Sequence, residues 1–216
     1  MKSSPRHYDQ SYFKYQEKIG EFGGQANLFK FVDFIKPTDT VLDFGCGGGY
    51  LLKNITCQKK LGIEINLAAR LKAKTNKVHA FDHVKKIKNN SVDVIISNHA
   101  LEHTFSPLTE LKNLHPKLKK TGRIVFVVPH EVKMSWKAGD VNQHLYTWSP
   151  MNIGNLFTTA GFTVEKVETI KHRWPPFYME IRKIVGQTLF DVICKIYSRV
   201  DGSWFQVRVV AHKNLV

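Results

Sequence analysis

TVLDFGCGGGY, at residues 40–50, joins a short apolar strand to a loop with glycine at positions 45, 47 and 49. Glycine lets the backbone turn tightly and lets a ligand approach the main chain without a Cβ in the way. A dinucleotide-binding fingerprint would read GxGxxG, whereas here the acid Asp43 precedes the first glycine in the pattern DxGxGxG. Asp43 would repel a pyrophosphate, so the ligand should carry positive charge or hydrogen-bond donors at that end.

Short apolar runs and helical patterns alternate on both sides of this loop. Strands are expected at 40–44, 60–65, 77–80, 92–97, 122–129, 163–170 and 203–212, and helices at 50–54, 67–74 and 107–118. Strands that are apolar almost throughout and are separated by helical crossovers are typical of a parallel sheet covered on both faces. The pattern therefore predicts a doubly wound α/β fold, in which ligands bind beyond the carboxyl ends of the strands.

Composition and length indicate a single domain over 1–216, with 43% hydrophobic and 23% charged residues. We expect an N-terminal helical cap at 1–36, a cofactor-binding core at 37–170, a helical insertion at 171–202 and a last strand at 203–212. The three cysteines are widely spaced, which indicates neither a disulfide framework nor a zinc site, and no metal is predicted. Neither a signal peptide nor a spanning helix is indicated, so a cytoplasmic location is expected.

The charge balance is strongly basic, with 32 Lys and Arg against 18 Asp and Glu and a net charge of +14. Such a field attracts anionic partners such as nucleic acid or acidic lipid surfaces. Many of the lysines stand in short runs between elements, for example at 85–88 and 117–120, where charge mainly keeps a protein soluble. A nucleic-acid partner and a peripheral membrane contact stay open, and neither is favoured.

Two further acids follow the next strands. Glu64, in GIEIN at 62–66, could accept hydrogen bonds from both ribose hydroxyls and would repel a 2′-phosphate. Asp82 and His83 follow the third strand, where an acid can accept from an exocyclic amine and a backbone N–H can bond a ring nitrogen. An adenine nucleoside with a free ribose satisfies both positions, although Asp82 alone could be an ordinary surface acid.

From about 40 to 170 the sequence resembles the class I S-adenosylmethionine-dependent methyltransferases. The resemblance is carried by VLDFGCGGGY, GIEIN, Asp82, VDVIISNHALEH, GRIVFVVP and the segment from HLYTWSP to GFTVEKVE. Leu101-Glu102-His103 and Gly161-Phe162 are most similar to the small-molecule subgroup that includes ubiquinone and menaquinone methyltransferases. The resemblance implies a Rossmann-like sheet of about seven strands, mostly parallel with an antiparallel last strand, and helices on both faces.

The resemblance also implies S-adenosylmethionine as cofactor, with S-adenosylhomocysteine as the product. Asp43 and the backbone around the glycines would face the methionine end, Glu64 the ribose, and Asp82 with His83 the adenine. The cofactor-binding residues implied in this way are Asp43, Gly45, Cys46, Gly47, Glu64, Ile65, Asp82, His83 and Asn98.

Methyl transfer from a sulfonium needs mainly an acceptor held in line, about 3–3.5 Å away. A general base helps only where the acceptor must lose a proton, and histidine is the usual candidate. By similarity His103 would be catalytic, with Glu102 orienting it or contacting the acceptor, while His144 suits a structural role in its loop. The histidines near the strand ends, each of which could instead be structural, are His99, His103, His130 and His144.

The acceptor is expected to be a small molecule such as a sugar, a lipid-linked intermediate or a quinone-like ring. The fourth strand is followed by SNHA at 97–100 rather than by Pro-Pro-aromatic, which disfavours adenine-N6 methylation, and no cysteine follows a proline as cytosine-C5 chemistry requires. The alternatives are an RNA- or protein-directed methyltransferase and a non-catalytic cofactor-binding subunit.

Two segments outside the core carry aromatic or apolar patterns. A helical pattern follows WPPFYM at 174–179, and its apolar positions should pack on the domain or a second subunit, cover the acceptor, or rest on a membrane surface. These positions are Ile181, Ile184, Val185, Leu189, Ile193, Ile196 and Tyr197. Aromatic residues near the N-terminus could form a second lid or simply pack, namely Tyr8, Tyr12, Phe13 and Tyr15.

Overall fold

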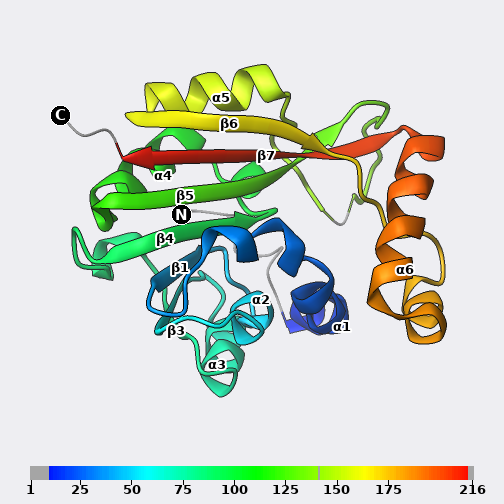
Figure 1. The fold of residues 1–216 in the computed structure, drawn as a ribbon, viewed down its shortest axis with the longest axis horizontal. Coiled ribbons are helices and arrows are strands. Elements are labelled where there is room, and N and C mark those ends of the chain that lie inside the picture. Colours follow the sequence, from blue (N-terminus) through cyan, green and yellow to red (C-terminus); the bar gives the residue numbers. More distant parts are fainter. Residues whose placement is uncertain (1–9, 141, 214–216) are drawn as a thin grey trace.

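The computed structural model describes residues 10–140 and 142–213, which form one sheet of seven strands in the order β3-β2-β1-β4-β5-β7-β6 (Figure 1). The strands are β1 Thr40–Phe44, β2 Lys59–Ile63, β3 His79–Phe81, β4 Val92–Asn98, β5 Leu118–Glu131, β6 Phe162–Ile170 and β7 Trp204–Lys213. The pairs β1–β2, β2–β3, β1–β4 and β4–β5 are parallel, while β7 runs antiparallel to both β5 and β6. The predicted sheet with an antiparallel last strand is confirmed.

Helices cover both faces of the sheet. They are α1 Gln10–Ala26, α2 Tyr50–Lys53, α3 Leu67–Thr75, α4 Pro107–Leu114, α5 Pro150–Thr159 and α6 Tyr178–Asp201. Short 3₁₀ turns lie at Leu28–Lys30, Val32–Phe34, Val84–Lys86, Leu101–His103 and His115–Lys117. None of the helices in the described ranges is long and apolar enough to cross a membrane.

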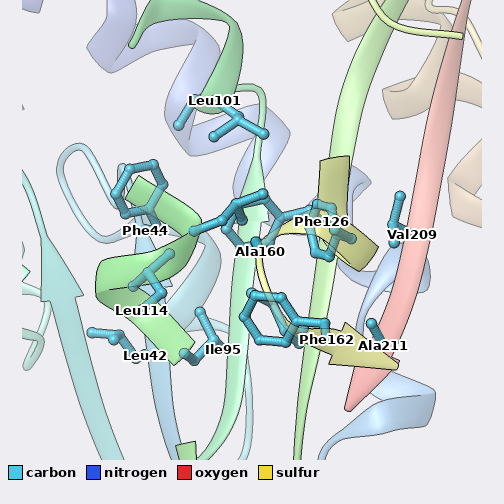
Figure 2. Packing of buried hydrophobic residues seen from close by; sticks show 14 of the residues in the cluster. Leu42, Phe44, Ile95, Leu101, Leu114, Phe126, Ala160, Phe162, Val209 and Ala211 are labelled. Atoms are coloured by element: carbon cyan, nitrogen blue, oxygen red, sulfur yellow. The ribbon is translucent and has the colours of Figure 1, made fainter. Parts of the chain in front are cut away.

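Alternate strand residues supply two separate cores because successive side chains of a strand point to opposite faces. Leu42 and Ile95 belong to a core that includes α4 and α5 residues, part of which Figure 2 shows around Leu42, Phe44, Ile95 and Phe126. Val41 and Val94 belong to the other core, with residues of α2 and α3. The double coverage explains why the strands read as nearly unbroken apolar runs.

Three expectations are corrected. The helix expected at 107–118 ends at Leu114, because Pro116 cannot donate the helical hydrogen bond and a 3₁₀ turn takes over. β5 begins at Leu118 rather than at 122, because Leu118 already pairs with Val92.

The third correction concerns only one of the alternatives for the apolar positions of α6, namely that they pack on the domain. Its buried side chains are Phe190, Cys194 and Ser198, whereas Ile184 is 83% exposed and Ile196 57% exposed. Gly186 interrupts the helix with a φ of 74°, so the periodicity does not continue through it. Of the N-terminal aromatics, Tyr8 lies outside the described residues, as do the side chains of Tyr12, Phe13 and Tyr15.

Candidate functional site

The glycine loop lies at the switch point between β1 and β4, where the strand order reverses. Gly45 and Gly47 have φ values of 78° and 51°, in the left-handed region that favours glycine. A Cβ on Gly45 would come within 2.3 Å of the Ala100 Cβ, whereas a Cβ on Gly47 would meet nothing within 4 Å. Gly45 is thus required by packing, and Gly47 borders open space that a ligand could fill.

Two carboxylates flank this loop, of which Asp43 is buried and Glu64 is partly exposed. The Gly47 N–H donates to Glu64 Oε2 at 3.0 Å and the Asn66 N–H donates to Glu64 Oε1 at 2.8 Å, so both oxygens of Glu64 are held. Burial, with the negative charge of Glu64 as a second cause, raises the pKa of Asp43 to about 7. Burial also raises the pKa of Glu64, against the opposing effect of these backbone donors. Two acids beside one cavity favour a ligand that carries positive charge.

The cavity beside the loop has a volume of about 630 Å³, within the range of small-molecule sites. All the predicted cofactor-binding residues except Asp82 and His83 line it. The cavity continues past Asn98 towards a second region that we call the acceptor chamber, lined by Lys30, His99, His103, His144, Trp174 and Trp204.

Asp82 and His83 lie outside this lining. Asp82 forms an ion pair of 2.8 Å with Lys86, which holds the pKa of the Asp82 carboxyl below its ordinary value. His83 Nδ1 accepts a hydrogen bond of 3.0 Å from the Lys85 N–H and so caps the following 3₁₀ turn. The role of both residues towards adenine stays a prediction.

The two predicted catalytic residues differ in their access to the cavity. His103 lines the cavity, whereas Glu102 is 0% exposed and is not part of the lining. Glu102 therefore lies behind the wall, in a position to orient histidines rather than to contact an acceptor. Burial raises the pKa of Glu102, but His99 and His103 outweigh that effect and hold it below its ordinary value.

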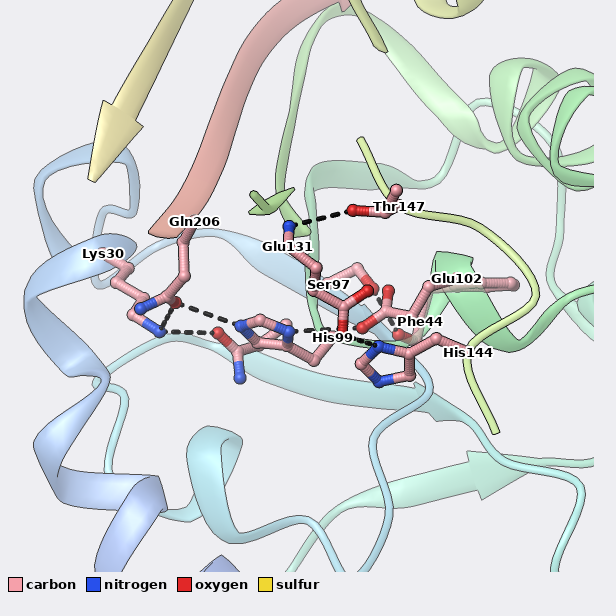
Figure 3. A network of polar contacts seen from close by, with 10 residues as sticks. Lys30, Phe44, Ser97, His99, Glu102, Glu131, His144, Thr147 and Gln206 are labelled. Carbon is pink, nitrogen blue, oxygen red and sulfur yellow. Dashed lines mark hydrogen bonds and ion pairs between the residues drawn. The ribbon is translucent and has the colours of Figure 1, made fainter. Parts of the chain in front are cut away.

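His99 connects Glu102 to residues from distant parts of the chain (Figure 3). Its Nδ1 lies 3.2 Å from Glu102 Oε1, its Nε2 lies 3.1 Å from Gln206 Oε1, and its ring stacks on Trp204. Both polar partners are oxygen atoms, so each ring nitrogen of His99 already faces a partner within the protein. His99 also has a φ of 55°, in the left-handed region that is uncommon for a residue with a side chain.

Lys30 extends this network and was not anticipated from the sequence. Its ammonium is buried and donates to Asn98 Oδ1 at 3.1 Å and also to Gln206 Oε1. Burial, with repulsion from Arg208 as a second cause, lowers the pKa of Lys30 to about 7. One sequence feature could have pointed to this pair. Lys30 and Gln206 are polar residues within the apolar runs LFKFV and FQVRVV.

The other two histidines have different surroundings. His130 Nδ1 lies 2.7 Å from the Trp148 carbonyl oxygen, a structural contact outside the cavity lining. His144 Nδ1 lies 2.8 Å from Glu131 Oε1, and His144 does line the cavity. His144, expected to be structural, is therefore also placed to meet a ligand.

A family model described as "Methyltransferase domain" matches residues 15–167. An uncharacterized protein of Methanocaldococcus jannaschii is 34% identical over 175 residues, which are 78% of this chain and 68% of that protein.

Solved structures share the fold. An S-adenosylmethionine-dependent methyltransferase of Archaeoglobus fulgidus superposes with a TM-score of 0.66 at 20% identity, over 95% of this chain and 100% of that one. A phosphoethanolamine N-methyltransferase of Haemonchus contortus, in complex with phosphomonomethylethanolamine and S-adenosylhomocysteine, has a TM-score of 0.60 at 16% identity and 88% coverage of this chain. The present chain spans 52% of the length of the Haemonchus contortus protein.

Proposed function

The chain belongs to the methyltransferase domain family, and on that basis we propose that it transfers the methyl group of S-adenosylmethionine to a small hydroxylated acceptor by in-line displacement. The observation that carries the proposal is one cavity that joins the glycine loop, Asp43 and Glu64 to a chamber lined by histidine and tryptophan. A cofactor and an acceptor could thus meet without crossing protein.

The cofactor end is supported by charge. S-adenosylmethionine carries a sulfonium and an α-ammonium group, and the buried Asp43 and the partly exposed Glu64 are acids on the wall of the cavity. Glu64 suits the ribose hydroxyls, and Gly47 leaves the open space described above. Cys46, Ile65 and Asn98 complete the wall on this side.

The acceptor chamber supports a compact acceptor with an ionisable hydroxyl. Trp174 and Trp204 provide flat apolar walls, which suit a sugar or a quinone-like ring. Since both ring nitrogens of His99 already face partners within the protein, His103 is the better-placed base, with the carboxylate of Glu102 behind the cavity wall to orient it.

The reaction then balances simply. The acceptor oxygen bonds to the methyl carbon, the carbon–sulfur bond breaks with its electron pair passing to sulfur, and S-adenosylhomocysteine leaves. The hydroxyl proton passes to His103. No covalent intermediate with the protein is needed.

Calorimetric titration with S-adenosylmethionine and S-adenosylhomocysteine tests the cofactor site. Glu64→Ala should weaken both affinities at least about tenfold, because charge-assisted hydrogen bonds are among the strong ones. Glu165→Ala, which removes a half-exposed acid that pairs with Arg123 on the surface, is the matched control and should bind as the wild type does. A folded wild type that binds neither ligand at millimolar concentration would refute the proposal. Binding would justify an acceptor screen with methyl-labelled cofactor.

A further inference from the structure

Three side chains beside the acceptor chamber form a compact group of metal-ligand types. One ligand atom from each of Glu102, His103 and His144 lies within 4.8 Å of the other two. Glu102 and His103 come from the turn after β4 and His144 from the loop before α5, and the Leu145 N–H donates to the Glu102 carbonyl oxygen at 3.0 Å. This backbone bond fixes the two segments against each other.

The carboxylate of Glu102 is an independent sign that the group is incomplete. It is 0% exposed, and one of its oxygens, Oε1, lies 3.2 Å from His99 Nδ1. The other oxygen, Oε2, has no hydrogen-bond partner among the residues that the structure describes. A buried carboxylate with one oxygen unpartnered is costly, and a directly bound cation is one way in which proteins compensate for it.

His144 has the support that metal-binding histidines usually have. Such a histidine binds the metal through one ring nitrogen and donates its other N–H to a carboxylate or a carbonyl. Glu131 Oε1 lies 2.8 Å from His144 Nδ1 (Figure 3). The pair holds the ring in place and adds a second negative charge close to the group.

We propose that Glu102, His103 and His144 bind a first-row divalent transition-metal ion such as Zn²⁺. Two imidazoles and one carboxylate suit such ions better than Mg²⁺ or Ca²⁺, which prefer oxygen ligands. Three protein ligands leave coordination positions open, as in catalytic metal sites. His103 and His144 both line the cavity, so the open positions face the acceptor.

Metal binding itself does not depend on methyl transfer, whereas its role rests on the proposed function. A metal ion that binds the acceptor hydroxyl lowers the pKa of that hydroxyl. The proton can then pass to water at neutral pH, so His103 is a ligand in the metal-bound protein and acts as the base only in the metal-free protein. Acceptors with a hydroxyl or an acid group would be preferred.

The test is calorimetric titration of the untagged full-length protein with zinc sulfate, after treatment with a chelator. We expect a single equivalent to bind, and we expect Glu102→Gln and His144→Ala each to weaken binding at least about tenfold. His79→Ala, which removes an exposed histidine on β3, is the control and should bind as the wild type does. Absence of zinc binding by the wild type would overturn the proposal, and so would equal loss in His79→Ala and His144→Ala.

A parallel titration with S-adenosylhomocysteine separates this proposal from the proposed function. His144→Ala should lose zinc and keep S-adenosylhomocysteine, because His144 is on the acceptor side of the cavity. If circular dichroism shows that Glu102→Gln does not fold, zinc binding by His144→Ala decides the test. His144 is a half-buried loop residue, so its replacement should leave the fold intact. Zinc binding without S-adenosylhomocysteine binding in the wild type would support the metal site and refute the proposed function.

Discussion

Asp43 is buried at the end of β1, and its raised pKa has opposite consequences for stability and for binding. The pKa of this carboxyl is about 7 in the folded chain and about 3.9 in an unfolded one. Between these values the native state holds a proton that the unfolded state has released, so stability falls as the pH rises through this window. A cationic ligand reverses the preference, because it favours the ionised carboxylate.

Asp43→Asn should therefore raise the melting temperature of the ligand-free protein at about pH 8 by a few degrees, and the gain should shrink as the pH falls towards about 4. The same variant should weaken S-adenosylmethionine binding at about pH 8. Differential scanning fluorimetry across this pH range, with and without ligand, measures both effects. A lower melting temperature for the variant at the alkaline end would contradict the explanation from burial.

The sequence could place residues beside the cavity where a strand is followed directly by a loop. Asp43 and the glycines belong to one such strand and loop, Glu64 follows the next strand, and all of them line the cavity. Their roles towards a cofactor stay predictions. Lys30 could not be identified from the sequence, because its place in the site depends on a contact with Gln206, which is 176 positions away. Asp82 shows the opposite case, since an acid at the expected position pairs with Lys86 outside the cavity lining.

At the scale of the element, two glycines of one loop have different roles. Substitution of Gly45 should affect mainly the stability of the fold, and substitution of Gly47 mainly ligand binding. Gly45→Ala places a Cβ 2.3 Å from the Ala100 Cβ, so it adds a clash to the strain of a positive φ. Gly47→Ala adds the strain alone, roughly 1–2 kcal/mol, but its methyl group enters the open space beside Glu64. Gly45→Ala should lower the melting temperature clearly more than Gly47→Ala does.

Gly47→Ala should instead lose most of its stabilisation by S-adenosylhomocysteine. Thermal melts of both variants over a ligand series measure the two quantities separately, because a ligand that binds only the native state raises the melting temperature with its concentration. Equal ligand-induced shifts for Gly47→Ala and the wild type would show that the cofactor does not approach this glycine.

The elements of the core could be predicted from the sequence more fully than those that cover it. Each core strand is an apolar run that ends at a loop, and this local pattern is sufficient to locate the strand. The α6 helix has more apolar residues than it buries. Phe190 and Cys194 are buried, whereas Leu189 and Ile196 are exposed. Periodicity finds an apolar stripe, but only the neighbours decide which stripe is covered.

At the scale of the whole molecule, α1 and α6 lie side by side although the chain between them forms most of the sheet (Figure 1). The Phe22 ring of α1 lies 4.9 Å from Trp174, 4.7 Å from Tyr178 and 5.7 Å from Phe190, measured between ring centroids. Gly23, Gly24 and Trp174 also line the cavity. A single aromatic cluster thus joins the two covering helices to the ligand site.

Phe22→Ala should therefore loosen both helices and weaken S-adenosylhomocysteine binding, because binding must then order what the cluster orders in the wild type. Limited proteolysis with mass mapping should show faster cleavage within α6 in this variant, slowed again by saturating S-adenosylhomocysteine. Phe105→Ala removes a phenylalanine that is 58% exposed and is the control. If α6 were cleaved at the same rate in both variants, the aromatic cluster would not couple the two helices.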